Sequence, residues 1–413
     1  MVRYVAIALL LLLGGCGDGS SGQPATVSVS PSPTPTASSA PAINTALRFD
    51  ANGVAIAPPD AAAVAAYRID SAVALSLDGF DKIPSNFDRT TEVLVSQSPV
   101  NTDGDGALGA FRLTCQAAQL SFDDPIVYPG IVGGSPHLHQ WFGNTEANAL
   151  STFRSLRTTG QSTCMGPLNR SAYWMPAMIR GDGMAIRPDY LTVYYKRYPK
   201  TAPECKSTAR DCLPVPRGLR YIFGYDMRRM DQDQPENMIF KWKCVTPENT
   251  QRGGLTTKFT DLDCPAGNLL IGGLAAPDCW DGTRLDSPDH RSHMAYQQYG
   301  QSGGLPVCPS THPYLIPQFT LAASYSIEAG EDIHNWYLSS DRMPGMPQMS
   351  SGSTFHSDWF GAWDDETLQT WTSFCIDKRL SCVAGQLGDG TTMKRPANFG
   401  LKSPPRLISL QTP

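Results

Sequence analysis

Ten cysteines follow residue 100, and they constrain the fold of this chain more than any other feature. An even number of cysteines in an exported chain is typical of a disulfide framework. No two of them have the CxxC spacing of a zinc site, and oxidised cysteines cannot act as nucleophiles. The sequence therefore predicts up to five disulfides, with Cys205/Cys212 and Cys375/Cys382 as candidates to close small loops and the rest of the pairing open. The ten are Cys115, Cys164, Cys205, Cys212, Cys244, Cys264, Cys279, Cys308, Cys375 and Cys382.

The N-terminus resembles a bacterial lipoprotein signal. Arg3 precedes an apolar stretch, Val5–Leu13, that is too short to span a bilayer as a mature helix. Two glycines then stand directly before Cys16. The resemblance implies that residues 1–15 are a signal peptide and that a lipid on Cys16 anchors the exported protein to a bacterial membrane, in the periplasm or at the cell surface. The alternative is an ordinary secretory signal followed by an incidental cysteine.

Composition changes along the chain and suggests how it is divided. Residues 17–45 are rich in proline, serine and threonine and almost uncharged, so they cannot bury enough apolar surface to fold. We expect residues 16–45 to be the lipidated cysteine and a tether, and residues 46–110 to be a lead that packs on the body. Residues 111–413 are expected to form a single β-rich domain that holds the histidine motifs.

The body has the composition of a β protein. Glycine (37 residues) and proline (34 residues) are abundant, which favours short strands and turns. Residues 190–196 and 238–244 are rich in aromatic and β-branched side chains, and residues 319–327 have strand composition. We expect a mainly β fold, with β-sandwich-like antiparallel sheets, a few short α-helices and long loops.

The clearest helix signal begins at Asp364. This residue and the two acidic residues after it supply an N-cap and an acidic first turn. Leu368, Trp371 and Phe374 follow as an apolar stripe. Shorter helices are expected at two other places, residues 61–67 and 150–156.

Six of the seven histidines lie in short motifs that could build one site. On a strand, residues i and i+2 point to the same face, so His137 and His139 can reach one ion. His290 and His293, three apart, can share a face of a helical turn. Imidazole suits zinc and copper, so we take His137, His139, His290, His293 and His356 as candidate ligands of a divalent metal, zinc or copper. The alternative is that these are structural histidines hydrogen-bonded beside turns, because HxH is a weak motif by itself.

Three further side chains are candidates for acid–base catalysis, namely Asp286, Asp358 and His312. With a metal, bound water would become the nucleophile. Without one, a carboxyl group would act as general acid or base with a histidine as its partner. A glycosidase needs two carboxyls that flank the scissile bond, and their separation cannot be read from the sequence.

Aromatic residues crowd the same motifs. Trp141, Trp359, Tyr173 and Trp174 are candidate substrate-binding residues, because an aromatic face beside polar groups is a natural platform for a sugar ring. The alternative for each of them is packing in the core.

The ordered set of motifs resembles a known family. It comprises Gly109–Cys115, Asp124-Pro-Ile-Val, His137-x-His139-x-Trp-Phe-Gly-Asn, Ser162-Thr-Cys164, Tyr173-Trp-Met-Pro176, Tyr194-Tyr-Lys196, Pro216–Arg220, Cys279-Trp-Asp-Gly282, Asp286–His293, Cys308-Pro-x-x-His-Pro313 and His356-x-Asp-Trp. This is similar to the secreted fungal and bacterial family catalogued as domain of unknown function 1996, over about residues 111–382. The resemblance implies export and a glycan or cell-envelope setting, and it carries no reaction.

The sequence thus predicts an extracytoplasmic, lipid-anchored, carbohydrate-active enzyme with a His/Asp site that holds a divalent metal. Its expected partner is a glycan or cell-envelope polysaccharide, and it meets the membrane only through the lipid. A net charge of −5 argues against nucleic-acid binding. The alternatives are a non-catalytic glycan-binding module and a structural cell-envelope protein.

Overall fold

The computed structural model describes residues 44–74, 76–207, 212–230, 240–298, 306–397 and 399–411. These residues belong to one compact unit, Ala42–Pro413. The expected signal peptide, Cys16 and nearly all of the expected tether lie outside the described residues. The boundaries expected at residues 46 and 111 stay predictions.

Two large sheets dominate the described residues, and they are antiparallel except for one ladder, β20 with β3. The six-stranded sheet has the order β1 (Arg48–Phe49), β4 (Ala117–Ser121), β5 (His139–Gly143), β6 (Ala172–Pro176), β19 (His356–Phe360) and β10 (Arg220–Gly224). The seven-stranded sheet has the order β12 (Gln251–Thr256), β11 (Phe240–Val245), β13 (Leu269–Ala275), β17 (Gln318–Ser326), β9 (Tyr190–Arg197), β3 (Gly109–Cys115) and β20 (Ser381–Cys382).

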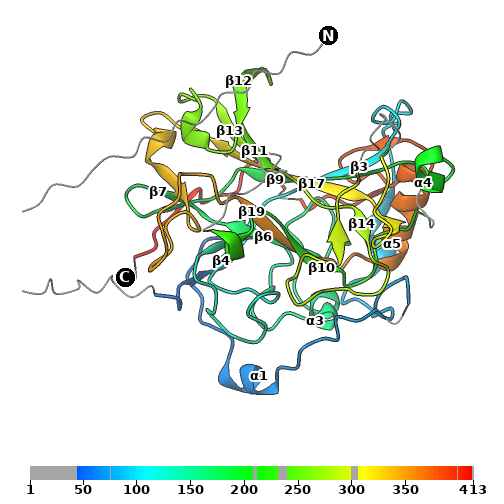
Figure 1. Cartoon of the computed structure of the whole chain (residues 1–413), viewed down its shortest axis with the longest axis horizontal. Helices are drawn as coiled ribbons and strands as arrows, with labels where there is room; N and C mark the ends of the chain where they lie inside the picture. Colours follow the sequence, from blue (N-terminus) through cyan, green and yellow to red (C-terminus); the bar gives the residue numbers. More distant parts are fainter. Residues whose placement is uncertain are drawn as a thin grey trace, which may run out of the picture. The chain divides into compact units, whose positions relative to one another are not determined.

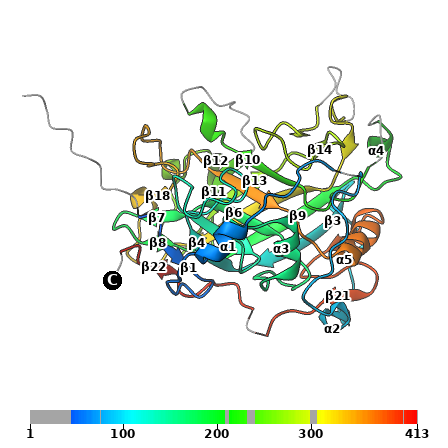
Figure 2. The same cartoon turned by 90° about the horizontal axis from the view of Figure 1, so that it is seen from below.

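Smaller elements surround these sheets (Figures 1 and 2). A four-stranded sheet has the order β18 (Trp336–Leu338), β7 (Met178–Arg180), β8 (Ala185–Ile186) and β22 (Leu407–Ile408). A three-stranded sheet has the order β15 (Met294–Ala295), β14 (Cys279–Trp280) and β16 (Tyr314–Leu315). Strands β2 (Val93–Val95) and β21 (Thr391–Met393) form a two-stranded sheet. The α-helices are α1 (Ala61–Ala66), α2 (Arg89–Glu92), α3 (Phe153–Thr158), α4 (Pro203–Ser207) and α5 (Asp365–Trp371). Short 3₁₀ turns lie at Met227–Arg229, Phe259–Asp261 and Ile333–Asn335, and a π-helical turn at Thr372–Ile376.

The main core lies between the two large sheets. Strand β9 alternates partly buried and buried residues, as expected when one face of a strand packs against a core. Phe142 and Trp359 of the six-stranded sheet belong to the same hydrophobic cluster as Val193 and Phe319 of the seven-stranded sheet. In Figure 1, β9 and β17 run above β6 and β10. The predicted mainly β fold with sandwich-like antiparallel sheets is confirmed.

The other face of the six-stranded sheet is covered as well. Trp141 and Trp174 stack on it with ring centroids 4.5 Å apart, and Phe153 and Leu156 of α3 belong to the same cluster. Figure 2 shows α3 on this side of the molecule. Strands β5, β6 and β19 are therefore buried on both faces, so polar side chains on them sit in a largely apolar environment.

The predicted elements agree well with the observed ones. Strand β9 covers the expected residues 190–196, β17 covers all but the last residue of 319–327, and β11 covers the described part of 238–244. Helix α5 begins after Asp364, whose carboxylate accepts a hydrogen bond from the backbone N–H of Thr367. Helices α1 and α3 lie within or overlap the two segments expected to form shorter helices.

All ten body cysteines form disulfides, as the even count predicts. Cys205–Cys212 and Cys375–Cys382 close the two small loops that their spacing suggests. Disulfides of this number are typical of an extracellular or exported protein. Among the described residues, no helix is both long and apolar enough to cross a membrane. The other three pairs are Cys115–Cys164, Cys244–Cys264 and Cys279–Cys308.

Candidate metal centre

The central strands of the six-stranded sheet carry candidate residues on one face. Residues paired across antiparallel strands project to the same face, and so do residues two apart in one strand. The register pairs His139 of β5 with Pro176 of β6. It also pairs Asp358 of β19 with Trp174, which lies two residues before Pro176. His356, two residues before Asp358, therefore shares the face of His139, with β6 between them.

Three imidazoles meet at this face. The ring centroids of His137 and His139 lie 4.4 Å apart, and those of His137 and His356 lie 5.2 Å apart. One nitrogen of each ring lies within 4.8 Å of the other two, and no other such group of three is found in the described part of the chain. The three side chains are only 6%, 1% and 4% exposed. An ion held at about 2.0–2.1 Å by each nitrogen needs them roughly 3.4 Å apart, so small ring movements would complete the site.

Two of these rings have their protonated nitrogen fixed by the backbone. Nδ1 of His139 lies 2.9 Å from the carbonyl oxygen of Asp123, and Nδ1 of His356 lies 2.7 Å from that of Thr354. A carbonyl oxygen can only accept a hydrogen bond, so Nδ1 carries the proton in both rings. Nε2 of each ring therefore keeps its lone pair.

The third ring has a hydroxyl partner. Nδ1 of His137 lies 3.5 Å from Oγ of Ser339, and this hydroxyl itself donates to the carbonyl oxygen of Leu138 at 2.6 Å. Oγ is thus left as an acceptor toward His137. Outer partners that hold one ring nitrogen of each histidine are typical of metal-ligating imidazoles.

Burial keeps all three imidazoles uncharged. Desolvation lowers the pKa of each ring well below its ordinary value, and the positive charge of a neighbouring ring lowers it further. A metal binds only the neutral imidazole, so these rings remain competent ligands below neutral pH.

A cavity of about 440 Å³ opens beside the centre. His137 and His356 line it, and Asp124, Asp358 and His290 line it too. Apolar and thioether side chains form much of the remaining wall, including Val127, Ile222, Met227, Met343 and Met346. A mostly apolar cavity with a few converging polar groups is the usual form of a small-molecule site.

Two of the four carboxyl groups that line the cavity, those of Asp124 and Asp358, are buried. Burial, and next the charge of Asp124, raises the pKa of Asp358 well above its usual range. No described residue forms a hydrogen bond with Oδ2 of Asp358. Burial also raises the pKa of Asp124, although the backbone N–H groups of Ile126 and Val127 donate to it. Burial thus favours the protonated form of Asp358 more than it would in water.

His290 faces the cavity from a separate loop and is not one of the three clustered imidazoles. Its Nδ1 lies 2.9 Å from Oδ1 of Asp286, and Nε of Arg220 donates to Oδ2 of the same carboxylate at 3.2 Å. The backbone of His290 is left-handed, with φ at +56°, which is unusual for a residue other than glycine. Such strain persists where the surrounding structure enforces it, and functional sites are common examples.

His293 does not join the cluster, which corrects the expectation that it ligates a metal with His290. Its Nε2 lies 3.0 Å from the carbonyl oxygen of Arg220, and its Nδ1 lies 2.8 Å from the hydroxyl of Ser287. Both ring nitrogens are thus used in hydrogen bonds. The segment is a turn and not a helix, so the two rings do not share a helical face.

His312 also lies apart from the centre. Its Nδ1 is 2.9 Å from the hydroxyl of Thr311, and its Nε2 is 2.9 Å from the carbonyl oxygen of Ser292. It does not line the cavity beside the three imidazoles, so the structure gives no support to a catalytic role there.

The four candidate sugar-binding aromatics are core residues. Trp141, Tyr173, Trp174 and Trp359 have 0% of their surface exposed. Trp141 and Trp174 stack on each other, and the hydroxyl of Tyr173 lies 2.8 Å from that of Tyr195. None of them presents a face to a ligand, so the platform expectation is corrected in favour of the packing alternative.

The groups that orient the imidazoles were not identified from the sequence. Two of the three are backbone carbonyl oxygens, of Asp123 and Thr354, and every residue has one. Ser339 lies far along the chain from His137, without any local motif. No sequence signal could have selected these partners.

Comparison with known proteins gives one match. No curated protein and no solved structure matches the chain. The sequence model of the family described as domain of unknown function (DUF1996) matches residues 124–363. This is more than half of the chain, and it includes His137, His139 and His356 together with Asp358 and His290. The chain belongs to the DUF1996 family.

Proposed function

We propose that this protein is an exported metal-dependent enzyme. In this proposal His137, His139 and His356 hold one divalent ion, zinc or copper, and the cavity of about 440 Å³ beside them takes the substrate. The observation that carries the proposal is the convergence of three buried imidazoles whose Nδ1 atoms are all engaged by other groups, so that three Nε2 lone pairs are left.

Three protein ligands leave a coordination position open, which is the pattern of a catalytic centre and not of a structural one. A divalent ion bound there supplies Lewis-acid chemistry, including a lowered pKa of a bound water. In this proposal Asp358, whose pKa is raised by burial, donates a proton to a leaving group in the cavity that it lines. His290, whose Nδ1 is held by Asp286, lines the same cavity and is the proposed partner of Asp358 in the reaction.

We propose a glycan of the cell envelope as the substrate. The support is the resemblance of the chain to secreted proteins of cell-wall setting, together with a cavity that offers carboxyl groups and a histidine to hydroxyls. The buried aromatics add nothing to this argument. We also propose that the exported chain is anchored through a lipid on Cys16, which rests on the lipoprotein-like N-terminus.

Elemental analysis of protein purified without a histidine tag tests the metal. We expect close to one zinc or copper per chain in the wild type. His139→Ala and His356→Ala should each lose it, because removing one of three ligands leaves too few. His334→Ala is the matched control, because the His334 side chain is 58% exposed and its Nδ1 pairs with Asp332, outside the cavity.

Product analysis on cell-envelope glycans then tests turnover. Release of product by wild-type protein and by His334→Ala, but not by the metal-free variants, supports the enzyme. If the protein binds glycan but holds no ion and releases no product, the result would contradict the enzyme and support the non-catalytic glycan-binding module. A wild type that holds no ion after reconstitution with either metal would contradict the metal centre itself.

A further inference from the structure

We infer that Arg48 is a positioning residue of the metal centre, acting through Asp123 on two of its ligands. The inference rests on the proposed function, because it concerns the affinity of that same centre for its ion. The family model matches residues 124–363, and both Arg48 and Asp123 precede them. The inference therefore extends the site to strand β1, which the family model does not cover.

Arg48 and Asp123 form a buried, two-pronged ion pair. Nη1 of Arg48 donates to Oδ1 of Asp123 at 2.8 Å, and Nη2 donates to Oδ2. The side chains are 4% and 0% exposed, so neither charge has water as an alternative partner. Two parallel hydrogen bonds between a guanidinium and a carboxylate fix geometry as well as charge.

Asp123 connects this ion pair to the imidazoles. Its backbone carbonyl oxygen accepts the Nδ1–H of His139 at 2.9 Å. Its Oδ1 also accepts the backbone N–H of Gly133 at 2.9 Å, which ties down the start of the loop that leads to His137. A single residue therefore orients one ligand directly and restrains the loop of a second.

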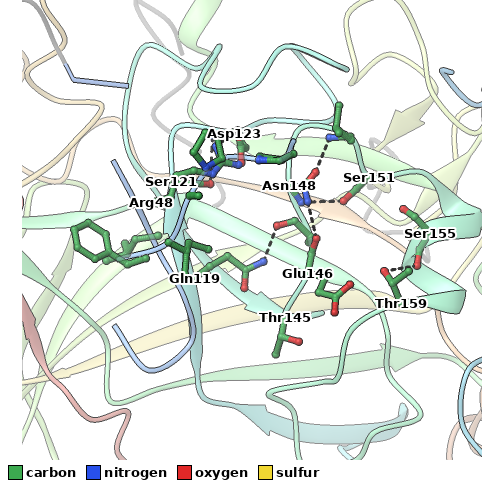
Figure 3. Close-up of a pocket in the computed structure, with 18 residues that line it drawn as sticks. Arg48, Gln119, Ser121, Asp123, Thr145, Glu146, Asn148, Ser151, Ser155 and Thr159 are labelled. Atoms are coloured by element: carbon green, nitrogen blue, oxygen red, sulfur yellow. Dashed lines mark hydrogen bonds and ion pairs between the residues drawn. The ribbon is translucent and has the colours of Figure 1, made fainter. Parts of the chain in front are cut away.

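The sheet register places Arg48 in line with the centre. Arg48 of β1 pairs with Ser121 of β4, and Ser121 pairs with His139 of β5. Residues paired in this way project to the same face, so Arg48 and His139 lie on one face, separated by one strand. Figure 3 shows Arg48, Ser121 and Asp123 grouped at one end of a second cavity, of about 350 Å³.

Loss of Arg48 would leave the Asp123 carboxylate buried without its counter-charge. The Asp123 side chain then loses the two hydrogen bonds that fix it, so its contact to Gly133 and the backbone carbonyl that holds His139 are no longer kept in place. Mutation of groups that orient metal ligands typically lowers metal affinity by about 10–100-fold, and we expect a loss in this range.

The test compares Arg48→Met and Arg48→Lys with Arg187→Met. Arg187 is also buried, and its Nη2 donates to the carbonyl oxygens of Ala51, Ala117 and Ala118, so it joins the same lead segment to β4 without touching Asp123. Affinities for zinc and for copper(II) are measured separately by competition with a chelator. Each variant is used as the full chain, after circular dichroism has shown that it is folded.

We expect Arg48→Met to bind about 10–100-fold more weakly than wild type and Arg187→Met to stay within about threefold of it. Arg48→Lys should fall between, because lysine restores the charge without the two-pronged contact; it also carries the test if Arg48→Met does not fold. Folded Arg48 variants with wild-type affinity, or an equal loss in Arg187→Met, would overturn the inference while leaving the metal centre intact. A wild type that binds neither ion removes the proposed function and this inference with it.

Discussion

The buried imidazole of His293 links the stability of the protein to pH. Burial lowers its pKa to about 4 in the folded state, against an ordinary value of 6.5. Between these pH values the unfolded chain binds more protons than the folded one, so stability is lost as pH falls below about 6.5. The loss amounts to about 1.4 kcal/mol for each pH unit and ends near pH 4.

We therefore expect His293→Gln to show a weaker decrease of the free energy of unfolding between pH 6.5 and pH 4.5 than wild type. Urea denaturation at a series of pH values measures this slope. His334→Gln, with an exposed ring, should keep the wild-type slope. Equal slopes in wild type and His293→Gln would show that this ring does not titrate as its burial implies.

Asp358 has the opposite effect on the pH dependence of stability. Its pKa is raised in the folded state, so the folded chain holds a proton that the unfolded chain releases, and stability falls as pH rises above about 3.8. An asparagine at this position would have no such charge to bury. In metal-free protein at pH 8 we expect Asp358→Asn to be at least as stable as wild type in thermal unfolding. In metal-loaded protein the proposed function predicts that the same variant loses turnover. A clear destabilisation would mean that the carboxylate has a partner in the folded protein.

At the residue scale, motif spacing selected three histidines that the structure brings together. His137, His139 and His356 were predicted as ligands, and the structure places them together. The prediction extended too far for His293, because the expected helical turn is absent. The backbone of His290 is left-handed. A sequence predicts that conformation where it has a glycine, and this position holds a histidine.

At the scale of elements, α5 shows what local signals can and cannot predict. Asp364 and the apolar positions Leu368 and Trp371 predict the helix, and both apolar side chains are buried. The same stripe was expected to continue through Phe374, but the helix changes to a π-helical turn at Thr372–Ile376. The Cys375–Cys382 disulfide lies there, and although its short spacing predicts the bridge, the hydrophobic pattern does not predict the change of helix type.

The cap of α5 can be tested by itself. Asp364 accepts hydrogen bonds from the backbone N–H and the hydroxyl of Thr367, and its carboxylate also lies 3.4 Å from Nε of Arg89. We expect Asp364→Ala to lower the free energy of unfolding by about 1–2 kcal/mol, because the cap is lost. Asp364→Asn keeps a capping oxygen and should lose less than half of that amount. Equal losses in both variants would assign the effect to charge and not to the cap.

At the scale of the whole molecule, pairing between distant segments decides the architecture. The sequence predicted a sandwich-like β fold, but not that β19 would lie between β6 and β10, because hydrogen-bond ladders can form between any two strands of suitable pattern. The burial of Trp141 and Trp359 follows from the same packing of layers. These residues could be recognised as aromatic from the sequence, but not as inaccessible.

The five disulfides should contribute strongly to stability at this scale. Each native bridge typically contributes about 2–5 kcal/mol, so reduction should lower the unfolding temperature steeply. Thiol titration of denatured, unreduced body protein should find essentially no free cysteine. Several reactive thiols per chain would contradict the pairing observed in the structure.

The lipid anchor is also a property of the whole molecule, tested by Cys16→Ser. The thiol is the acylation point, so we expect the variant to remain unprocessed or to leave the membrane fraction. Fractionation of expressing cells, with the wild-type chain run in parallel, measures this. Unchanged membrane partitioning of a processed variant would exclude lipidation at this position.

The position of β6 between the two ligand-bearing strands has a consequence for maturation. His139 and His356 face each other across this strand, although 217 residues separate them along the chain. The three imidazoles therefore converge only once β19 has joined the sheet beside β6, and a nascent polypeptide lacks the complete set of three until then. Under the proposed function the ion is therefore acquired only after this pairing, and a bound ion reports that β19 has joined the sheet.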